Sequence, residues 1–451
     1  MNRNPSTRNV GQLLLIAFAM LVLTANASAE WKEKVLYSFQ GGSDGLTPAG
    51  GVVFDKAGNL YGVTNEGGST CPPPGCGTVF KLAPPTQKGG HWTETILYGF
   101  NGNDGSIPVG GAIIDGNGNL YGTTAYGGSG TCLLFGDNVG CGVVYELSPP
   151  IQKGGQWIYT VLYNFQGGKD GLFPWGDLAL DAVGNLYGAT QFGGGKGTSC
   201  NQYFDGNCGT VFKLSPPKKK DGKWTEKILH SFAGGTDGAT PNGGLVLDSK
   251  GVVYGTTYSG GNQSCRYQGE IGCGIAFKLS RTTKNSETWA EKKLHVFTGG
   301  NDGGQPSAGL VLDVVGSLYG VAGGGNVSGG GIVFRLMVAT GGHWKESVLH
   351  WFSDNGTGPP LAGLIFDPAG NLYGTTIGGN DGAAVFRLDP PKGKGDVWTL
   401  TVLHTFVGIP DGIVPDASLV FDKLGSLYST TQKGGTGTCS GGCGTVFEVS
   451  P

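Results

Sequence analysis

The sequence has few charged residues, no excess of basic ones, and no long apolar run beyond its N-terminus. Charged side chains make up only 14 % of the chain, roughly half the usual share, and 30 basic residues stand against 33 acidic ones. Without a basic surplus, a nucleic-acid partner is not expected. After residue 29 no stretch approaches the roughly 20 apolar residues that a membrane-spanning helix needs. We therefore expect no transmembrane span in the mature chain.

The N-terminus has the pattern of a secretory signal peptide. Two arginines precede an apolar stretch at residues 13–23, and an A-x-A cleavage site follows at residues 27–29. This pattern predicts that residues 1–29 are removed on export and that residues 30–451 form one secreted domain, periplasmic or extracellular. A retained membrane anchor is the alternative, which the shortness of the apolar stretch disfavours.

Glycine is unusually abundant, and a tandem repeat accounts for it. The chain has 89 glycines in 451 residues, against a usual share of roughly 7 %. A phrase of the form W-x-E-x-x-L-(Y/H)-x-F occurs seven times, and each copy continues with a D-G turn and then with G-L-V-(F/L)-D, G-N-L-Y-G-T-T and G-T-V-F-K-L. The copies begin at Trp31, Trp92, Trp157, Trp224, Trp289, Trp344 and Trp398.

Each copy contains four short segments that read as β-strands. They are rich in Val, Leu, Ile, Phe, Tyr and Thr and are bounded by Gly, Asp, Asn and Pro, which is typical of strands and turns. In the first copy the segments are residues 31–39, 51–55, 59–64 and 77–82. Four antiparallel strands in seven copies predict an all-β fold, a seven-bladed β-propeller. A stacked solenoid is the alternative, but it would need capping repeats, which the sequence lacks.

The two ends of the repeat array are complementary. The array opens on an outer strand, residues 31–39, that lacks the rest of its blade. It stops after a third strand, residues 444–449, that lacks an outer strand. Pairing these strands would close the ring and cover two exposed edges, which are otherwise aggregation hazards. Glycine pairs such as Gly50-Gly51 mark the inner strand, where the blades are expected to crowd the axis.

The repeat phrases resemble a known family. The L-Y-G-T-T phrases at residues 120–124 and 372–376 and the G-T-V-F-K-L phrases at residues 77–82 and 209–214 are similar to the Gly-rich tandem repeats called GloVer, found in secreted bacterial choice-of-anchor proteins. The resemblance covers residues 31–451. It implies secretion and a propeller-like array, and it implies no particular reaction. Family members often carry a C-terminal sorting segment, which this sequence does not show, so we expect no covalent surface anchor.

Cysteine occurs as five close pairs, each just before the third strand of a copy. In an exported protein this pattern predicts five disulfides, each within one loop. Zinc is the alternative, but each loop offers two thiols where a structural zinc site needs four ligands. The predicted disulfides join Cys71 to Cys76, Cys132 to Cys141, Cys200 to Cys208, Cys265 to Cys273 and Cys439 to Cys443.

Histidine and aspartate recur at repeat positions, which favours structural roles. Four of the six histidines occupy an outer-strand position that is a tyrosine in other copies. We therefore interpret this position as a packing position and predict no catalytic histidine. The histidines are His230, His295, His350 and His404, and the equivalent tyrosines are Tyr37, Tyr98 and Tyr163. One ring of aspartates follows the inner strand and a second lies in the D-G turns. Both are interpreted as turn formers. The D-G ring could instead ligate Ca²⁺, and no other cofactor is predicted.

Residues that break the repeat are the better candidates for a binding site, because a sevenfold fold does not require them. Trp175 and Asp177 break it at the inner edge of the third copy. Asp416 breaks it in the seventh copy, which we place far around the ring. An aromatic ring beside a carboxylate at the channel mouth fits a sugar or a peptide. Long disulfide-containing loops add further aromatic residues to the predicted site, namely Tyr126, Tyr203, Phe204 and Tyr267.

These observations favour an exported, monomeric binding or scaffold module without catalytic residues, whose ligand is a carbohydrate or a protein. Two alternatives remain. One is a secreted enzyme, such as a lyase, lactonase or glycosidase, with its site at the channel mouth. The other is a structural component of the cell surface. A glycosidase needs two carboxylates roughly 5 to 10 Å apart, so unique acidic residues gathered at the mouth would favour the enzyme.

Overall fold

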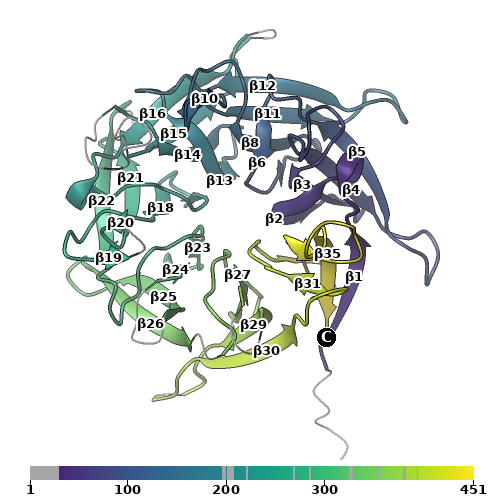
Figure 1. The fold of residues 1–451 in the computed structure, drawn as a ribbon. Helices are drawn as coiled ribbons and strands as arrows, with labels where there is room; N and C mark the ends of the chain where they lie inside the picture. Colours follow the sequence, from purple (N-terminus) through teal and green to yellow (C-terminus); the bar gives the residue numbers. More distant parts are fainter. Residues whose placement is uncertain are drawn as a thin grey trace, which may run out of the picture.

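The computed structural model is a ring of seven four-stranded antiparallel sheets around a central axis (Figure 1), which confirms the predicted propeller. The predicted signal peptide, residues 1–29, lies outside the described residues. The structure describes residues 30–195, 200, 208–219, 222–267, 270–283, 286–324, 329–353, 356–378, 382–393 and 395–451.

Each blade runs from a short inner strand at the axis to an outer strand at the rim. The first blade consists of β2 (Leu46–Phe54), β3 (Leu60–Glu66), β4 (Thr78–Ala83) and β5 (Thr93–Gly99), paired in that order. The next five blades repeat this order. The second has β6 (Ser106–Pro108) and β7 (Ile113–Ile114) at the axis, then β8 (Leu120–Tyr126), β11 (Val143–Ser148) and β12 (Ile158–Asn164), and the third has β13 (Leu172–Leu180), β14 (Leu186–Phe192), β15 (Thr210–Ser215) and β16 (Thr225–Ser231). The fourth blade has β17 (Val246–Leu247), β18 (Val253–Thr257), β21 (Ile275–Arg281) and β22 (Trp289–Val296), the fifth has β23 (Val311–Leu312), β24 (Leu318–Ala322), β25 (Gly329–Val338) and β26 (Trp344–Ser353), and the sixth has β27 (Ile365–Phe366), β28 (Leu372–Thr376), β29 (Ala384–Asp389) and β30 (Thr399–Thr405).

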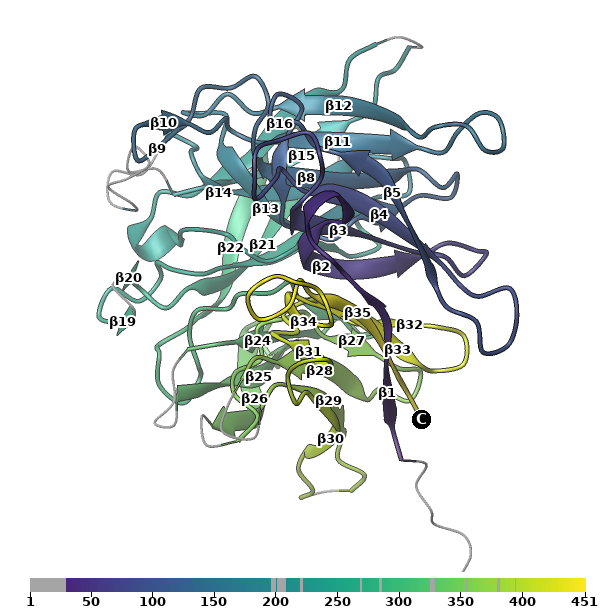
Figure 2. The ribbon, with the colours of Figure 1, turned by 45° about the vertical axis from the view of Figure 1, so that its right-hand side comes forward.

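The seventh blade joins the two ends of the chain. It consists of β32 (Val420–Phe421), β33 (Leu427–Thr431), β35 (Thr445–Ser450) and, as its outer strand, β1 (Lys32–Ser38). The outer strand runs antiparallel to β35, with Lys32 opposite Ser450 and Ser38 opposite Thr445. Figures 1 and 2 both place the purple β1 against the yellow β35. The predicted ring closure is therefore confirmed.

The remaining regular elements lie in loops. They include two short hairpins, β9 (Leu133–Leu134) with β10 (Asp137–Asn138) and β19 (Arg266–Tyr267) with β20 (Glu270–Ile271). A further two-stranded sheet pairs β31 (Gly412–Ile413) with β34 (Lys433–Gly434), on either side of β32 and β33 in the chain. Two single turns of 3₁₀ helix span Gly42–Asp44 and Gly235–Asp237. In the described part of the chain, no helix is long and apolar enough to cross a membrane.

Apolar layers between neighbouring blades hold the ring together, and they explain the repeated Trp and Tyr. The Trp at the start of an outer strand packs against the L-Y-G tyrosine of the preceding blade. Trp157 lies 5.8 Å from Tyr61 between ring centroids, and Trp31 lies 6.4 Å from Tyr373. The tyrosine hydroxyl in turn donates to the aspartate that closes the inner-strand turn, as Tyr61 does to Asp55 at 3.1 Å. One motif thus links packing between blades to the turn within a blade.

The glycines of the inner strands are required by close contact between neighbouring backbones at the axis. A Cβ on Gly50 would lie 2.2 Å from the backbone nitrogen of Gly111, and one on Gly110 would lie 2.4 Å from the carbonyl oxygen of Gly176. Gly50 also has a φ of +64°, a conformation that costs an L-residue about 1 to 2 kcal/mol. The inner strand is irregular here, with a shift of register between Ala49 and Val53, whereas a regular strand at residues 51–55 was predicted.

We expect Gly50→Ala to destabilise the ring by roughly 3 kcal/mol or more, because it adds a steric clash to the backbone strain. Gly58→Ala is the matched control, since Gly58 has a φ of +85° and nothing within 4 Å of its Cβ position. The control should lose only about 1 to 2 kcal/mol. Urea unfolding of both variants measures the difference, and equal losses would contradict the close contact at the axis.

Candidate functional site

The wall of the central channel contains one variable residue from each blade. This residue directly precedes a glycine in the first four blades and an alanine in the last three. A cavity of about 250 Å³ opens among these residues. They are Ala49, Val109, Trp175, Asn242, Ser307, Leu361 and Asp416.

Three residues that break the repeat lie together in this cavity. Trp175 and Asp177, from β13, line it with Asp416, from the segment before β32. The third and seventh copies lie far apart around the ring, as predicted. Their inner strands both reach the axis, however, so residues of the two copies line the same cavity.

Asp177 connects two blades as well as lining the cavity. Its Oδ1 accepts a hydrogen bond of 2.6 Å from the backbone N–H of Gly111 in the second blade. Burial raises the pKa of Asp177, and this hydrogen bond opposes the rise. One carboxylate oxygen therefore has a structural partner.

Asp416 is the second acid of the cavity, and an amide holds it in place. The Nε2 of Gln432, which follows β33, donates to Oδ2 of Asp416 at 2.6 Å. Burial raises the pKa of Asp416 from 3.8 to about 6. A carboxyl group with this pKa exchanges its proton close to neutral pH, so it can donate or accept a hydrogen bond toward a ligand.

Amide side chains complete the polar part of the wall. Gln191 donates to Asn242 at 3.0 Å across the third and fourth blades. Asn65 also lines the cavity, and its Oδ1 is buried without a hydrogen-bond partner among the described residues. The wall thus presents two carboxyl groups and several amides beside the indole of Trp175. It suits a small polar ligand with one flat apolar face.

The other predicted site residues are not brought into the cavity. Tyr126 lies outside its lining, and its ring packs edge-on against Phe173 at 4.8 Å. Tyr203 and Phe204 lie outside the described residues. Tyr267 is described only as part of β19, without its side chain. The sequence identified Asp416 as a residue that breaks the repeat, but Asp416 was not predicted as a site residue. Asn65, Asn242 and Gln432 were not predicted as site residues either.

The cysteines are paired as predicted, and they do not line the cavity at the axis. Each disulfide closes a single loop, so none of them links two blades. The five bonds join Cys71 to Cys76, Cys132 to Cys141, Cys200 to Cys208, Cys265 to Cys273 and Cys439 to Cys443. The alternative of zinc ligation by these thiols is therefore not needed.

The D-G turns lie directly beside these disulfide loops. In the first blade, for example, the N–H of Gly68 donates to the carbonyl oxygen of Gly42 at 2.9 Å. At the junction of the seventh and first blades, a Cβ on Gly41 would lie 3.0 Å from the Sγ of Cys439 and 3.3 Å from that of Cys443. The disulfide loops and the D-G turns therefore share one face of the propeller.

Both aspartate rings are used in local hydrogen bonds. Asp55 accepts the backbone N–H groups of Ala57 and Asn59, each at 2.9 Å, as predicted for a turn former. Asp44, in a D-G turn, accepts the hydroxyl of Tyr37 at 2.6 Å. The shared Tyr/His position is thus a hydrogen-bonding position and not merely a packing one, because His404 likewise contacts Asp411 at 3.1 Å. Calcium binding by the D-G ring stays a prediction.

A glutamate on the outer strand of a blade lies close to the Tyr/His–Asp pair of the preceding blade. In the seventh blade this glutamate is Glu33. One carboxylate oxygen of Glu33, one of Asp411 and a ring nitrogen of His404 lie within 4.8 Å of one another. The same arrangement recurs where Glu291 lies near His230 and Asp237. We therefore interpret it as a repeated contact between blades rather than as a metal centre.

A comparison with known protein families identifies the repeat. The Gloeobacter/Verrucomicrobia repeat matches residues 22–267 and 200–447. The chain belongs to this repeat family. It is the family that the repeat phrases suggested. No curated protein matches the sequence.

Solved structures give only distant likenesses. A gluconolactonase from Xanthomonas campestris is 15 % identical with a TM-score of 0.38, over 68 % of this chain and 78 % of that one. A luciferin-regenerating enzyme is 13 % identical with a TM-score of 0.42, over 75 % and 90 %. A protein of unknown function from Dyadobacter fermentans is 11 % identical with a TM-score of 0.45, over 93 % and 98 %. At these distances the likenesses carry no statement about activity.

Proposed function

We propose that this protein is an exported binding propeller that takes a carbohydrate at the mouth of its central channel. The observation that carries the proposal is the gathering of three repeat-breaking residues, Trp175, Asp177 and Asp416, in one cavity. The fold does not need them, because other blades place Ala, Val, Ser or Leu at the positions of Trp175 and Asp416.

The chemistry of the wall favours a sugar over a peptide. An indole face stacks on the apolar face of a sugar ring, while carboxylates and amides hydrogen-bond its hydroxyls. A volume of about 250 Å³ lies just below the usual range of roughly 300 to 1,000 Å³ for small-molecule pockets. The site therefore suits one terminal sugar residue rather than a long internal segment of a polysaccharide.

Export is supported by the cysteines. All ten cysteines are in disulfides, which form and persist in oxidising compartments such as the periplasm or the exterior. The signal-peptide pattern of residues 1–29 points the same way.

A second candidate function, glycoside or lactone hydrolysis, is favoured by one observation. Two carboxyl groups with raised pKa, Asp177 and Asp416, line the same cavity, and such pairs serve acid–base catalysis in many hydrolases. Mass spectrometry of a bound glycan after long incubation separates the two functions. The binding module returns the glycan intact. A glycosidase shortens it and a lactonase adds the mass of one water to a lactone, and Asp416→Asn abolishes either change.

We expect Trp175→Ala to raise the dissociation constant for the bound glycan at least fivefold, because it removes a stacking face worth about 1 kcal/mol or more. A glycan array identifies the ligand, and calorimetry on the full mature chain measures the affinity. Trp351→Ala is the matched control. Trp351 is also an extra tryptophan, but it lies on β26 with 52 % of its surface exposed. An unchanged affinity in Trp175→Ala, or an equal loss in both variants, would remove the channel mouth as the site.

A further inference from the structure

A second concave site lies at the rim, between the third and fourth blades. It is a cavity of about 700 Å³ between the loop that joins β15 to β16 and the ends of β21 and β22. We call it the basic groove, because six cationic side chains line it. They are Lys213, Lys218, Lys219, Lys223, Lys227 and Arg281.

The charge of the basic groove contrasts with that of the whole chain. The protein carries 30 basic and 33 acidic residues, yet one acidic residue, Glu287, lines the basic groove among the described residues. Lys227 is the one cation of the basic groove that forms an ion pair in the described part of the chain. Lys220 and Asp221 of the same loop lie outside the described residues.

The fold does not require these cations. In the first two copies the corresponding loops carry neutral side chains where the third copy has Lys218 and Lys219. The neutral equivalents are Thr86 and Gln87 in the first copy and Ile151 and Gln152 in the second. Lys227 stands where the first two blades have Thr95 and Thr160, whereas the fourth and seventh blades have Lys292 and Lys34 there. The sixth blade has Lys392 at the position of Lys218. The basic groove is therefore a local accumulation of cations that other blades carry only in part.

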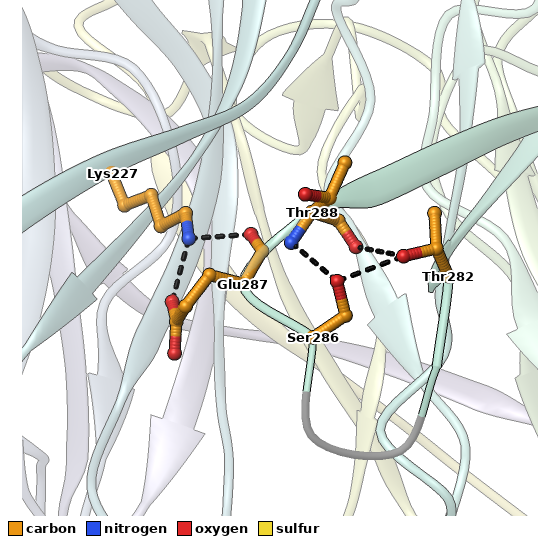
Figure 3. Close-up of polar contacts among 5 residues, drawn as sticks. All are labelled: Lys227, Thr282, Ser286, Glu287 and Thr288. Atoms are coloured by element: carbon orange, nitrogen blue, oxygen red, sulfur yellow. Dashed lines mark hydrogen bonds and ion pairs between the residues drawn. The ribbon is translucent and has the colours of Figure 1, made fainter.

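The basic groove already holds one carboxylate of its own chain. Figure 3 shows the ammonium of Lys227 between the carboxylate and the main-chain carbonyl of Glu287, with Nζ 2.6 Å from Oε2. Beside it, Thr282 donates to Ser286 at 2.8 Å. A carboxylate is thus an anion that these cations accommodate. Glu287 is largely exposed, with 84 % of its side-chain surface accessible.

Apolar surfaces and crowded charges complete the basic groove. Pro216, Pro217 and Trp289 line it, and the guanidinium of Arg281 lies 5.7 Å from the centre of the indole of Trp289. Burial lowers the pKa of Lys213; Arg281 adds to the lowering and Asp181 opposes it. A bound anion would relieve this crowding of like charges.

We propose that the basic groove binds a carboxylated polysaccharide, whose uronate groups pair with the lysines and Arg281 while a sugar ring lies against Trp289 and the prolines. The reasons are the six cations that line one cavity together with Trp289 and the prolines, and the carboxylate of Glu287 held by Lys227. A linear nucleic acid would instead need a phosphate-spaced basic stripe. The proposal is independent of the carbohydrate site at the channel mouth.

The test uses the full mature chain and polygalacturonate as the probe, with binding measured by calorimetry at 25 and 200 mM salt. Lys218→Gln/Lys219→Gln removes two exposed charges and should raise the dissociation constant about tenfold without changing the melting temperature. Lys88→Gln/Lys153→Gln removes two lysines from the equivalent loops of the first two copies and should change the constant less than twofold. Trp175→Ala should leave it unchanged.

Three results would overturn the proposal. One is no binding of polygalacturonate at 25 mM salt. The second is an equal loss in both lysine double variants, which would indicate a diffuse charge effect. The third is loss of binding in Trp175→Ala, which would place the polymer at the channel mouth. Heparin and duplex DNA are run as competitors, and tighter binding of either with no binding of polygalacturonate also contradicts a uronate site.

Discussion

A chain that begins at residue 40 should fail to form a stable ring. The deletion removes β1, whose backbone supplies the outer ladder of the seventh blade along the whole of β35. It also removes Leu36 and Phe39, which are buried in the cluster between the seventh and first blades. We expect the melting temperature to fall by more than about 10 °C, or cooperative unfolding to be lost, with aggregation through the exposed edge of β35.

Scanning calorimetry and size-exclusion chromatography compare the truncated chain with one that starts at Glu30. As a control, a synthetic peptide of residues 30–40 added to the truncated chain should restore part of the stability, because it can reoccupy the edge of β35. A truncated chain that melts like the full one would mean that the strand pairing does not hold the ring.

The stability of the propeller should fall as the pH rises from 5 to 8. Burial raises the pKa of Glu33, Glu94 and Glu226 from 4.5 to about 7, and an aspartate of the preceding blade raises each further. Each has an Oε1 that is buried without a partner among the described residues. The folded chain therefore keeps these protons up to about pH 7, whereas the unfolded chain releases them above about pH 4.5.

Between about pH 4.5 and 7 the folded chain binds more protons than the unfolded chain, so folding takes up protons. Raising the pH through this range therefore lowers the free energy of unfolding. Because the three side chains are only half-buried, solvent screening limits the effect to roughly 1 kcal/mol each. The triple variant Glu33→Gln/Glu94→Gln/Glu226→Gln keeps the shape and removes the titration. Its melting temperature should depend less on pH and should exceed that of the unaltered protein at pH 8.

The measurement is made above pH 5 so that aspartates with lowered pKa, such as Asp55 and Asp367, stay ionised. Burial lowers the pKa of His350, so His350 makes the folded chain more stable as the pH rises from 5 to 6.5. Both proteins contain His350, so it does not contribute to the difference between their pH profiles. A triple variant with the same pH profile as the unaltered protein would contradict the raised pKa of the glutamates.

The blades, their closure and the disulfides could be predicted because they repeat. A position that holds the same residue in all seven copies indicates a constraint that the fold imposes seven times, as the position of Tyr61 does. The hydrogen bonds of the Tyr/His position also had a signal in the sequence. The aspartate follows seven residues later in most copies, as from Tyr37 to Asp44 and from His404 to Asp411, yet the position was interpreted as packing only.

Contacts between distant copies could not be predicted in the same way. That Asp177 and Asp416 line one cavity depends on how closely the inner strands approach the axis, and no repeat phrase specifies this distance. The glutamates of the outer strands face the Tyr/His–Asp pair of the preceding blade, so this contact cannot be predicted from the sequence of a single repeat unit. The basic groove likewise forms from a loop of one blade and two strands of the next.

The repeated residues form the scaffold, and the residues that depart from the repeat at the channel mouth are proposed to form the binding site. Fluorine NMR of protein labelled with 5-fluorotryptophan tests this proposal most directly, because the nine tryptophans are spread over the channel and the rim. The variant Trp175→Phe identifies the resonance of Trp175. On titration with the glycan selected from the array, the resonance of Trp175 should shift more than that of Trp351 or of any of the seven repeat tryptophans. A titration in which other resonances move while that of Trp175 stays fixed would contradict the account.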